Sequence, residues 1–369
     1  RFNVTCAVGA GTARAAGGFP RPHRIHVEDA FPLAPENGPS MALKNKVGGG
    51  AALSILPAIC PALISGLSFA KKMHWGDGDF TFARPIRWIL ALFGSQQVAF
   101  TVGKVTSGNS TRGHRVHGPG PFTLDDASDY FRLMREQCPV SVSSSERRRI
   151  ICEGGDALAM EKKGRILWKE SLMEEVQGLS EHPVPILGSF DSTFLEIPRQ
   201  VLLTSMESHQ KSFGVEGESG RLLPHFLTVL NINPQDPDLV RKGWERVLRA
   251  RLEDARFFWQ SDLANGSFDN WLNSLDSVIF LAPLGSMGDK TRRIEKLCGW
   301  LADNSRWHSS RQALSKDDLT RAGRPCKSDL VSEMVKEFDT MPGLMGVIYA
   351  AKFDQSANVS AANAVQVLH

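Results

Sequence analysis

The stretch over residues 47–70 constrains the fold most strongly, because it carries no charged side chain. It is long enough to span a bilayer as a helix. However, three glycines at 48–50 dilute its apolar character, and Pro57 and Pro61 interrupt a regular helix. We therefore predict a buried helix over about residues 57–70 and no membrane contact, with a membrane span as the alternative.

The composition is that of an ordinary globular protein. With 369 residues, 42% hydrophobic and 22% charged, the chain can form two or three domains with cores of their own. A net charge of +3 permits contact with nucleic acid only through a local basic patch. The six cysteines are scattered without a Cys-x-x-Cys pair, which disfavours a zinc ribbon and a disulfide framework and favours a cytoplasmic location.

Local patterns predict helices and strands along the chain. Ser143 and Glu146 have the spacing of a capping box, which would open a helix ending near residue 162. Pro198 suits the first turn of a helix through residues 201–206. Short apolar runs predict strands over residues 88–94, 98–102, 182–188 and 226–232.

A long amphipathic helix is predicted over residues 238–263. Its apolar stripe consists of Val240, Trp244, Val247, Leu248, Leu252, Ala255 and Phe258. The opposite face carries Lys242, Arg246, Arg249 and Arg256. Such a basic face fits either contact with nucleic acid or simple solvation.

Arg251 in this helix carries a separate prediction. At about 100° per residue it falls inside the apolar stripe. A buried arginine needs a charged partner, and Asp254 lies three residues further on. We predict that Arg251 and Asp254 form a structural brace, with no catalytic role.

Two further segments hold candidate phosphate contacts. In residues 112–115, Gly113 permits close backbone approach, and Arg112, His114 and Arg115 could hold a phosphate. The alternative for that segment is a solvated turn. Lys211 is also a candidate, while the neighbouring His209 could equally cap a helix. No nucleophile or carboxylate is placed to complete an acid–base pair, so we predict no catalytic residue.

Several motifs recur in a familiar order. They are Met73-His74-Trp75-Gly76-Asp77, Phe82-Ala83-Arg84-Pro85, Thr111-Arg112-Gly113-His114-Arg115, Met206-x-x-His209-Gln210-Lys211-x-Phe213 and Arg251-Leu252-x-Asp254-Ala255-x-Phe257-Phe258. Together they resemble the β subunit of bacterial glycyl-tRNA synthetase over about residues 56–353. The resemblance implies a cytoplasmic α2β2 enzyme that joins glycine to tRNA(Gly). It also implies that ATP and Mg2+ are bound by the α subunit and by no residue of this chain.

The resemblance implies an α+β protein. We expect a poorly ordered, non-family segment over residues 1–50, followed by mixed α/β domains over residues 51–163 and 164–265. The second of these is similar to a module of phenylalanyl-tRNA synthetase. An all-helical, HD-like domain is expected over residues 266–353 and a divergent tail over 354–369, in a chain that stops before the anticodon-binding domain.

Within the HD-like domain, the metal-binding His-Asp pair of that superfamily is replaced by Ser328 and Asp329. Without imidazole ligands we expect a degenerate scaffold that binds no metal at Asp329. Pro325 is predicted to interrupt a helix just before this pair. The predicted tRNA-binding residues are Arg112, His114, Arg115, Lys211, Arg246 and Arg249. The alternatives are a non-catalytic RNA-binding fragment and an HD-type metal-dependent phosphohydrolase.

Overall fold

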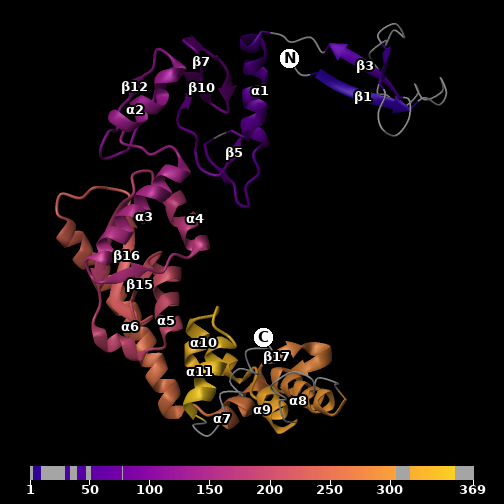
Figure 1. Ribbon diagram of the computed structural model, residues 1–369, viewed down its shortest axis with the longest axis vertical. Coiled ribbons are helices and arrows are strands. Elements are labelled where there is room, and N and C mark those ends of the chain that lie inside the picture. Colours follow the sequence, from indigo (N-terminus) through magenta and orange to yellow (C-terminus); the bar gives the residue numbers. More distant parts are fainter. Residues whose placement is uncertain are drawn as a thin grey trace. The chain divides into compact units, whose positions relative to one another are not determined.

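The computed structural model describes residues 3–9, 30–33, 40–46, 51–76, 78–304 and 316–353. The chain divides into two compact units, residues 1–138 and 139–369. The predicted boundary at residue 163 lies further along the chain, so the helix expected in the N-terminal domain groups with the second unit. Figure 1 shows the elements of both units, and the described content is the predicted mixture of helices and strands.

The first unit opens with a three-stranded antiparallel sheet. Its strands are β1 (Asn3–Gly9), β2 (Ala30–Leu33) and β3 (Ser40–Lys46), in the order β1–β3–β2. β1 contains β-branched residues that favour strands. The rest of residues 1–50 lies outside the described part of the chain.

Helix α1 (Ala52–Gly66) replaces the predicted helix over 57–70 and differs from it in burial. Both prolines lie inside it, and none of its residues is buried. Ile55, Ile59 and Leu63 are exposed. The expectation of a buried helix was therefore wrong, since an uncharged sequence does not by itself supply a surface to pack against. In the described part of the chain, no helix combines the length and apolarity needed to cross a bilayer.

Short strands make up most of the remaining first unit. They are β4 (Met73–His74), β5 (Thr81–Phe82), β6 (Ile89–Leu90), β7 (Leu92–Phe93), β8 (Gln96–Gln97), β9 (Thr101–Val102), β10 (Val105–Gly108), β11 (Ser110–Thr111) and β12 (Phe122–Thr123). A 3-10 turn (Ala127–Asp129) and α2 (Tyr130–Glu136) follow. The run over 88–94 thus forms two short strands, and the run over 98–102 is a strand only at its end.

A four-stranded antiparallel sheet organises the second unit. Its order is β13 (Gly164–Ile166), β15 (Phe213–Gly217), β16 (Leu222–Leu230) and β14 (Val184–Ser189). Successive residues of a strand point to opposite faces. The adjacent residues Phe226 and Leu227 of β16 are both buried, in two different hydrophobic clusters. The sheet is therefore covered on both faces.

Helices supply the two covers. α3 (Ser144–Met160) and α4 (Glu170–Leu179) pack in the cluster around Leu227, and α5 (Arg199–Thr204) and α6 (Pro237–Asn265) pack in the cluster around Phe226. The Ser143 hydroxyl accepts a hydrogen bond from the Glu146 amide, which confirms the predicted helix start. The predicted long helix over 238–263 is also confirmed, as α6.

The C-terminal part is mostly helical. It contains α7 (Phe268–Ser274), α8 (Met287–Asn304), α9 (Lys316–Gly323), a 3-10 turn (Ser328–Val331), α10 (Glu333–Glu337) and α11 (Leu344–Phe353). Two strands, β17 (Ile279–Leu281) and β18 (Gly285–Ser286), pair here and correct the all-helical expectation. The residues of β17 are apolar and include the β-favouring Ile279 and Phe280, and Gly285 at the start of β18 has a positive φ where the chain turns. Helix α9 ends before Pro325, as predicted.

Candidate nucleic-acid interface

The segment 112–115 separates into a buried histidine and two exposed arginines. His114 is 2% exposed, and its amide donates to the Cys138 carbonyl at 2.8 Å. Its Nδ1 accepts from the amides of Val116 and His117, at 3.3 and 3.2 Å. An atom that accepts hydrogen bonds carries no proton, so Nδ1 is the unprotonated nitrogen. His114 therefore braces the loop and does not face solvent, contrary to the predicted contact role.

Gly113 allows this loop to pack closely. A Cβ at this position would lie 2.4 Å from the Gly118 carbonyl oxygen and 2.5 Å from the Cβ of Cys138. The close backbone approach inferred from the sequence is confirmed. Arg112 and Arg115 are exposed on either side, and in the part of the chain that is described neither makes an ion pair. Both guanidinium groups are accessible to an anion.

Trp88 lies beside this segment and was missed by the sequence analysis. Its indole Nε1 donates to the Thr111 hydroxyl at 3.3 Å, and the residue is 43% exposed. The preceding residue, Arg87, is also exposed. The sequence predicts a strand that starts at Trp88, whereas the position of this tryptophan beside Arg87 was the signal for an exposed site. Strand β6 begins only after it.

The predicted basic face of α6 is present in part, because Arg256 is half-buried and pairs with Glu253. The buried residues of α6 include Leu248, Leu252 and Ala255, whereas Arg246 and Arg249 are exposed on the other side. Among the described residues neither arginine forms an ion pair.

The positive charge of arginines on α6 contributes to lowering the pKa of the Asp191 carboxylate. Its pKa lies below the usual range, mainly because the Thr193 amide donates to the carboxylate, with Arg249 and Arg256 contributing through their charges.

The predicted Arg251–Asp254 brace was wrong. Both residues are exposed, and they make no ion pair with each other. The stripe used in the prediction included Val247, which is 48% exposed. The buried strip is centred near Leu248, and at about 100° per residue Arg251 falls about 60° from that centre.

Lys211 and His209 are both engaged with other parts of the protein. Lys211 Nζ lies 3.0 Å from Glu175 Oε1, and its backbone has a positive φ of 50°. His209 ends a π-helical turn (Ser205–His209) and packs against the ring of Phe338. An RNA phosphate would have to compete with Glu175 for the lysine, so Lys211 is a weaker candidate than the exposed arginines.

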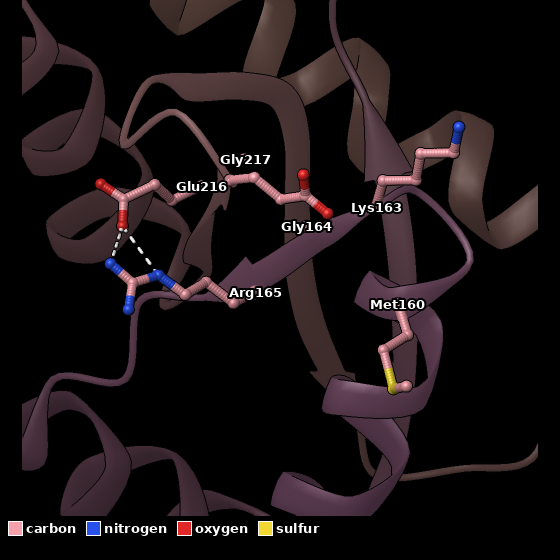
Figure 2. Close-up of a pocket in the computed structure, with 7 residues that line it drawn as sticks. Met160, Lys163, Gly164, Arg165, Glu216 and Gly217 are labelled. Carbon is pink, nitrogen blue, oxygen red and sulfur yellow. Dashed lines mark hydrogen bonds and ion pairs between the residues drawn. The ribbon is translucent and has the colours of Figure 1, made fainter.

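Figure 2 shows a cleft in the second unit that is braced by an ion pair. Its volume is about 590 Å³, and its walls include Lys163, Arg165 and Glu216. The Glu216 side chain is 7% exposed and lies 2.6 Å from Arg165 and 2.8 Å from Arg199. Hydrogen bonds from Arg199 and Arg165 hold the pKa of Glu216 below its usual range. The Glu216 carboxylate links β15 to β13 and α5 through these two ion pairs, so it is not available as a general base.

Two buried carboxylates of the C-terminal part cap helices. Asp329 Oδ2 accepts from the amides of Gly343 and Gly346 at the start of α11. Asp262, near the end of α6, accepts from the amides of Glu333 and Met334 at 2.9 Å each. Carboxylates at helix N-termini stabilise the exposed amides there. The structure gives Asp329 this capping role. Within the described ranges, no group of three or more His, Cys, Asp or Glu could hold a metal ion.

Exposed arginines lie in both units of this α+β chain. The family model described as "Glycyl-tRNA synthetase beta subunit" matches residues 3–369. The chain belongs to this family. The match includes both ends, so the expectation that residues 1–50 and 354–369 lie outside the family was wrong.

Curated relatives agree with the family match. The chain is 58% identical to the glycine–tRNA ligase beta subunit of Nitratidesulfovibrio vulgaris strain Hildenborough, over 97% of this chain and 50% of the relative. Identity to the subunit of the same name is 57% in Oleidesulfovibrio alaskensis and 42% in Lawsonia intracellularis, each over 96% of this chain and 50% of the relative. The chain therefore spans about half the length of the curated relatives that it matches.

Proposed function

We propose that this chain acts as a β subunit, or part of one, in a glycine–tRNA ligase. It would bind tRNA(Gly) and assemble with an α subunit as an α2β2 enzyme that attaches glycine to the tRNA with ATP. The family match over residues 3–369 is the observation that carries the proposal. In this proposal the α subunit binds ATP and Mg2+, and the enzyme works in the cytoplasm.

The difference between the bonded carboxylates and the exposed arginines supports a role in binding. Asp262, Asp329 and Glu216 each bind backbone amides or arginines of the same chain. In contrast, Arg112, Arg115, Arg246 and Arg249 are exposed and form no ion pair among the described residues. Arginine binds phosphate bidentately, and such contacts position a nucleic acid without reading its sequence. The chain would thus orient the tRNA while the partner performs the chemistry.

The proposal is tested by mixing the purified chain with the α subunit of a relative and measuring mass by light scattering on a sizing column. Glycylation of tRNA(Gly) is then measured for each chain alone and for the mixture. We expect a complex in the column, with activity only in the mixture. Two separate peaks, with no tRNA binding by the chain, would contradict the proposal.

RNA binding without an α partner is the second candidate, supported by the same exposed arginines. It predicts binding that weakens with salt in the absence of the α subunit. A metal-dependent phosphohydrolase is the weaker alternative, because the Asp329 carboxylate is bound to the amides that begin α11. Metal-dependent hydrolysis of nucleotides by the purified chain would favour it.

A further inference from the structure

The Trp88 ring is held in one orientation while part of it faces solvent. Its Nε1 donates to the hydroxyl of Thr111, which is 6% exposed and lies on β11. On the other side, β6 begins at the next residue and pairs with β10 in parallel, Ile89 opposite Ser107. Trp88 therefore joins two strands of the first unit, and its 43% exposure leaves ring surface open to a ligand.

Arginines adjoin both partners of this hydrogen bond in the sequence, just outside β6 and β11. Arg87 precedes Trp88, and Arg112 follows Thr111, with Arg115 three residues further on. All three are exposed, and among the described residues none forms an ion pair. An exposed aromatic ring combined with accessible arginines near it in the sequence suits unpaired nucleotides, which place bases on aromatic rings and phosphates on cations.

We propose that Trp88 is a stacking platform for an unpaired base of RNA, with Arg87 and Arg112 holding the adjoining phosphates. The inference rests on the proposed RNA-binding function and deepens it by naming an unpaired nucleotide as the ligand. In a duplex both faces of a base are covered by neighbouring pairs, whereas an unpaired base offers a free face to the indole. The site therefore discriminates between single strands and duplexes.

Among the described residues, the other exposed aromatic side chains lack this combination. Trp300 is more exposed, at 59%, but it lies on α8 and no arginine adjoins it in the sequence. Phe257 adjoins Arg256, whose guanidinium pairs with Glu253 and lies over the ring of Phe194. Trp300 is consequently a matched control, being an exposed tryptophan in the other unit with no arginine next to it in the sequence.

The test measures fluorescence anisotropy of labelled RNA against the full chain over a range of salt concentrations. The probes are tRNA(Gly), an unstructured RNA of about twelve nucleotides and a duplex of equal length. Stacking on an aromatic side chain accounts for about tenfold in affinity for each base. We expect Trp88→Leu to weaken binding of the single strand about tenfold, leaving the salt slope and the duplex affinity unchanged. Trp88→Phe should retain most of the affinity.

Two further variants separate stacking from charge and from folding. Arg112→Gln should weaken binding and reduce the salt slope by about one unit, as expected for a lost phosphate contact. Thr111→Val keeps the ring but removes its hydrogen bond, so we expect a smaller loss than for Trp88→Leu. Trp300→Leu should bind as the unmodified chain does. Circular dichroism and melting temperatures verify that each variant folds.

Equal binding of the single strand by folded Trp88→Leu and the unmodified chain would overturn the stacking proposal. An equal loss on single strand and duplex would also overturn it, because that result describes a general surface. If tRNA(Gly) binds the unmodified chain and Trp88→Leu equally well, only the stacking proposal fails. If the unmodified chain binds neither RNA nor an α subunit, the proposed function fails together with it.

Discussion

Removing the hydroxyl of Tyr349 tests whether the buried Asp262 carboxylate ties the C-terminal helices to α6. Asp262 Oδ2 accepts from this hydroxyl at 2.6 Å, across 87 residues of sequence. The same carboxylate accepts from the amides of Glu333 and Met334. The tyrosine ring is fully buried and stacks on Trp259, with ring centroids 5.5 Å apart. The Asp262 side chain, on α6, thus connects this helix to α10 and α11.

Tyr349→Phe deletes the hydrogen bond to Asp262 and leaves the ring in place. A hydrogen bond to a charged group contributes about 1.5–3 kcal/mol to folding. The aromatic contacts with Trp259 and Trp271 are retained, so no large cavity term is added. The carboxylate also keeps its two amide donors. We therefore expect the free energy of unfolding to fall by about 2 kcal/mol.

The assay is urea unfolding followed by tryptophan fluorescence, since the centroids of Trp271 and Tyr349 are only 4.9 Å apart. The midpoint should fall while the slope stays constant. Burial, followed by the bond to Asp262, raises the pKa of Tyr349 above its usual range. The phenol is therefore protonated both at pH 7 and at pH 9, and the stability difference between the two proteins should be equal at these pH values.

The chain offers a matched control, because its other tyrosine is the half-buried Tyr130 in the first unit. Its hydroxyl has no partner among the described residues, so Tyr130→Phe should change the free energy of unfolding by less than about 0.5 kcal/mol. An equally small change for Tyr349→Phe would refute the idea that the hydroxyl–carboxylate bond stabilises this region. Asp262→Asn should cost more than Tyr349→Phe, because an amide nitrogen would face an N–H or O–H donor.

Three other substitutions or treatments give expected outcomes. Arg251→Ala should change the free energy of unfolding by less than about 0.5 kcal/mol and leave the melting temperature nearly unchanged, because the side chain is exposed. A large drop in melting temperature would support the buried brace. Glu216 has a pKa lowered from 4.5 by Arg199 and Arg165, so its stabilisation is present above pH 4.5 and is lost as the pH falls through the lower folded pKa. Glu216→Gln should therefore lower the melting temperature at pH 7 and have little effect at pH 2, and equal effects at both values would contradict this account. Burial raises the pKa of Cys326 to about 11, so iodoacetamide at pH 8 should label it, by mass spectrometry, in urea but not in the folded protein; rapid labelling without urea would show that the thiol is accessible.

Local signals in the sequence were reliable where a feature depends on neighbours in the chain. The Ser143 cap, the start of α6 and the end of α9 before Pro325 all follow from residues within one helical turn. Arg251 shows where such reasoning stops. Helical periodicity gives the angle between side chains, but the centre of the buried strip depends on which apolar residues the rest of the protein covers, and Val247 is left uncovered.

Contacts between distant segments could not be predicted in this way. Trp88 and Thr111 are 23 residues apart, and Asp262 and Tyr349 are 87 residues apart. Each pair forms only after the strands or helices that carry it have packed, and no single-sequence pattern encodes that geometry. The same limit explains His114, whose neighbouring arginines suggested a phosphate site while its own ring is fixed by backbone amides.

Whether a charged side chain is already paired within the protein, rather than its residue type, decides which of the predicted phosphate contacts are the better candidates. Lys211 is held by Glu175, so a phosphate gains from it only what exceeds the lost ion pair. Arg112 and Arg246 form no such pair among the described residues, and a phosphate would bind them without that competition. Since one belongs to each unit, the same reasoning predicts that both units contribute to the salt dependence of RNA binding. Substituting Arg112 and Arg246 together should then reduce the salt slope by about twice the effect of either change alone.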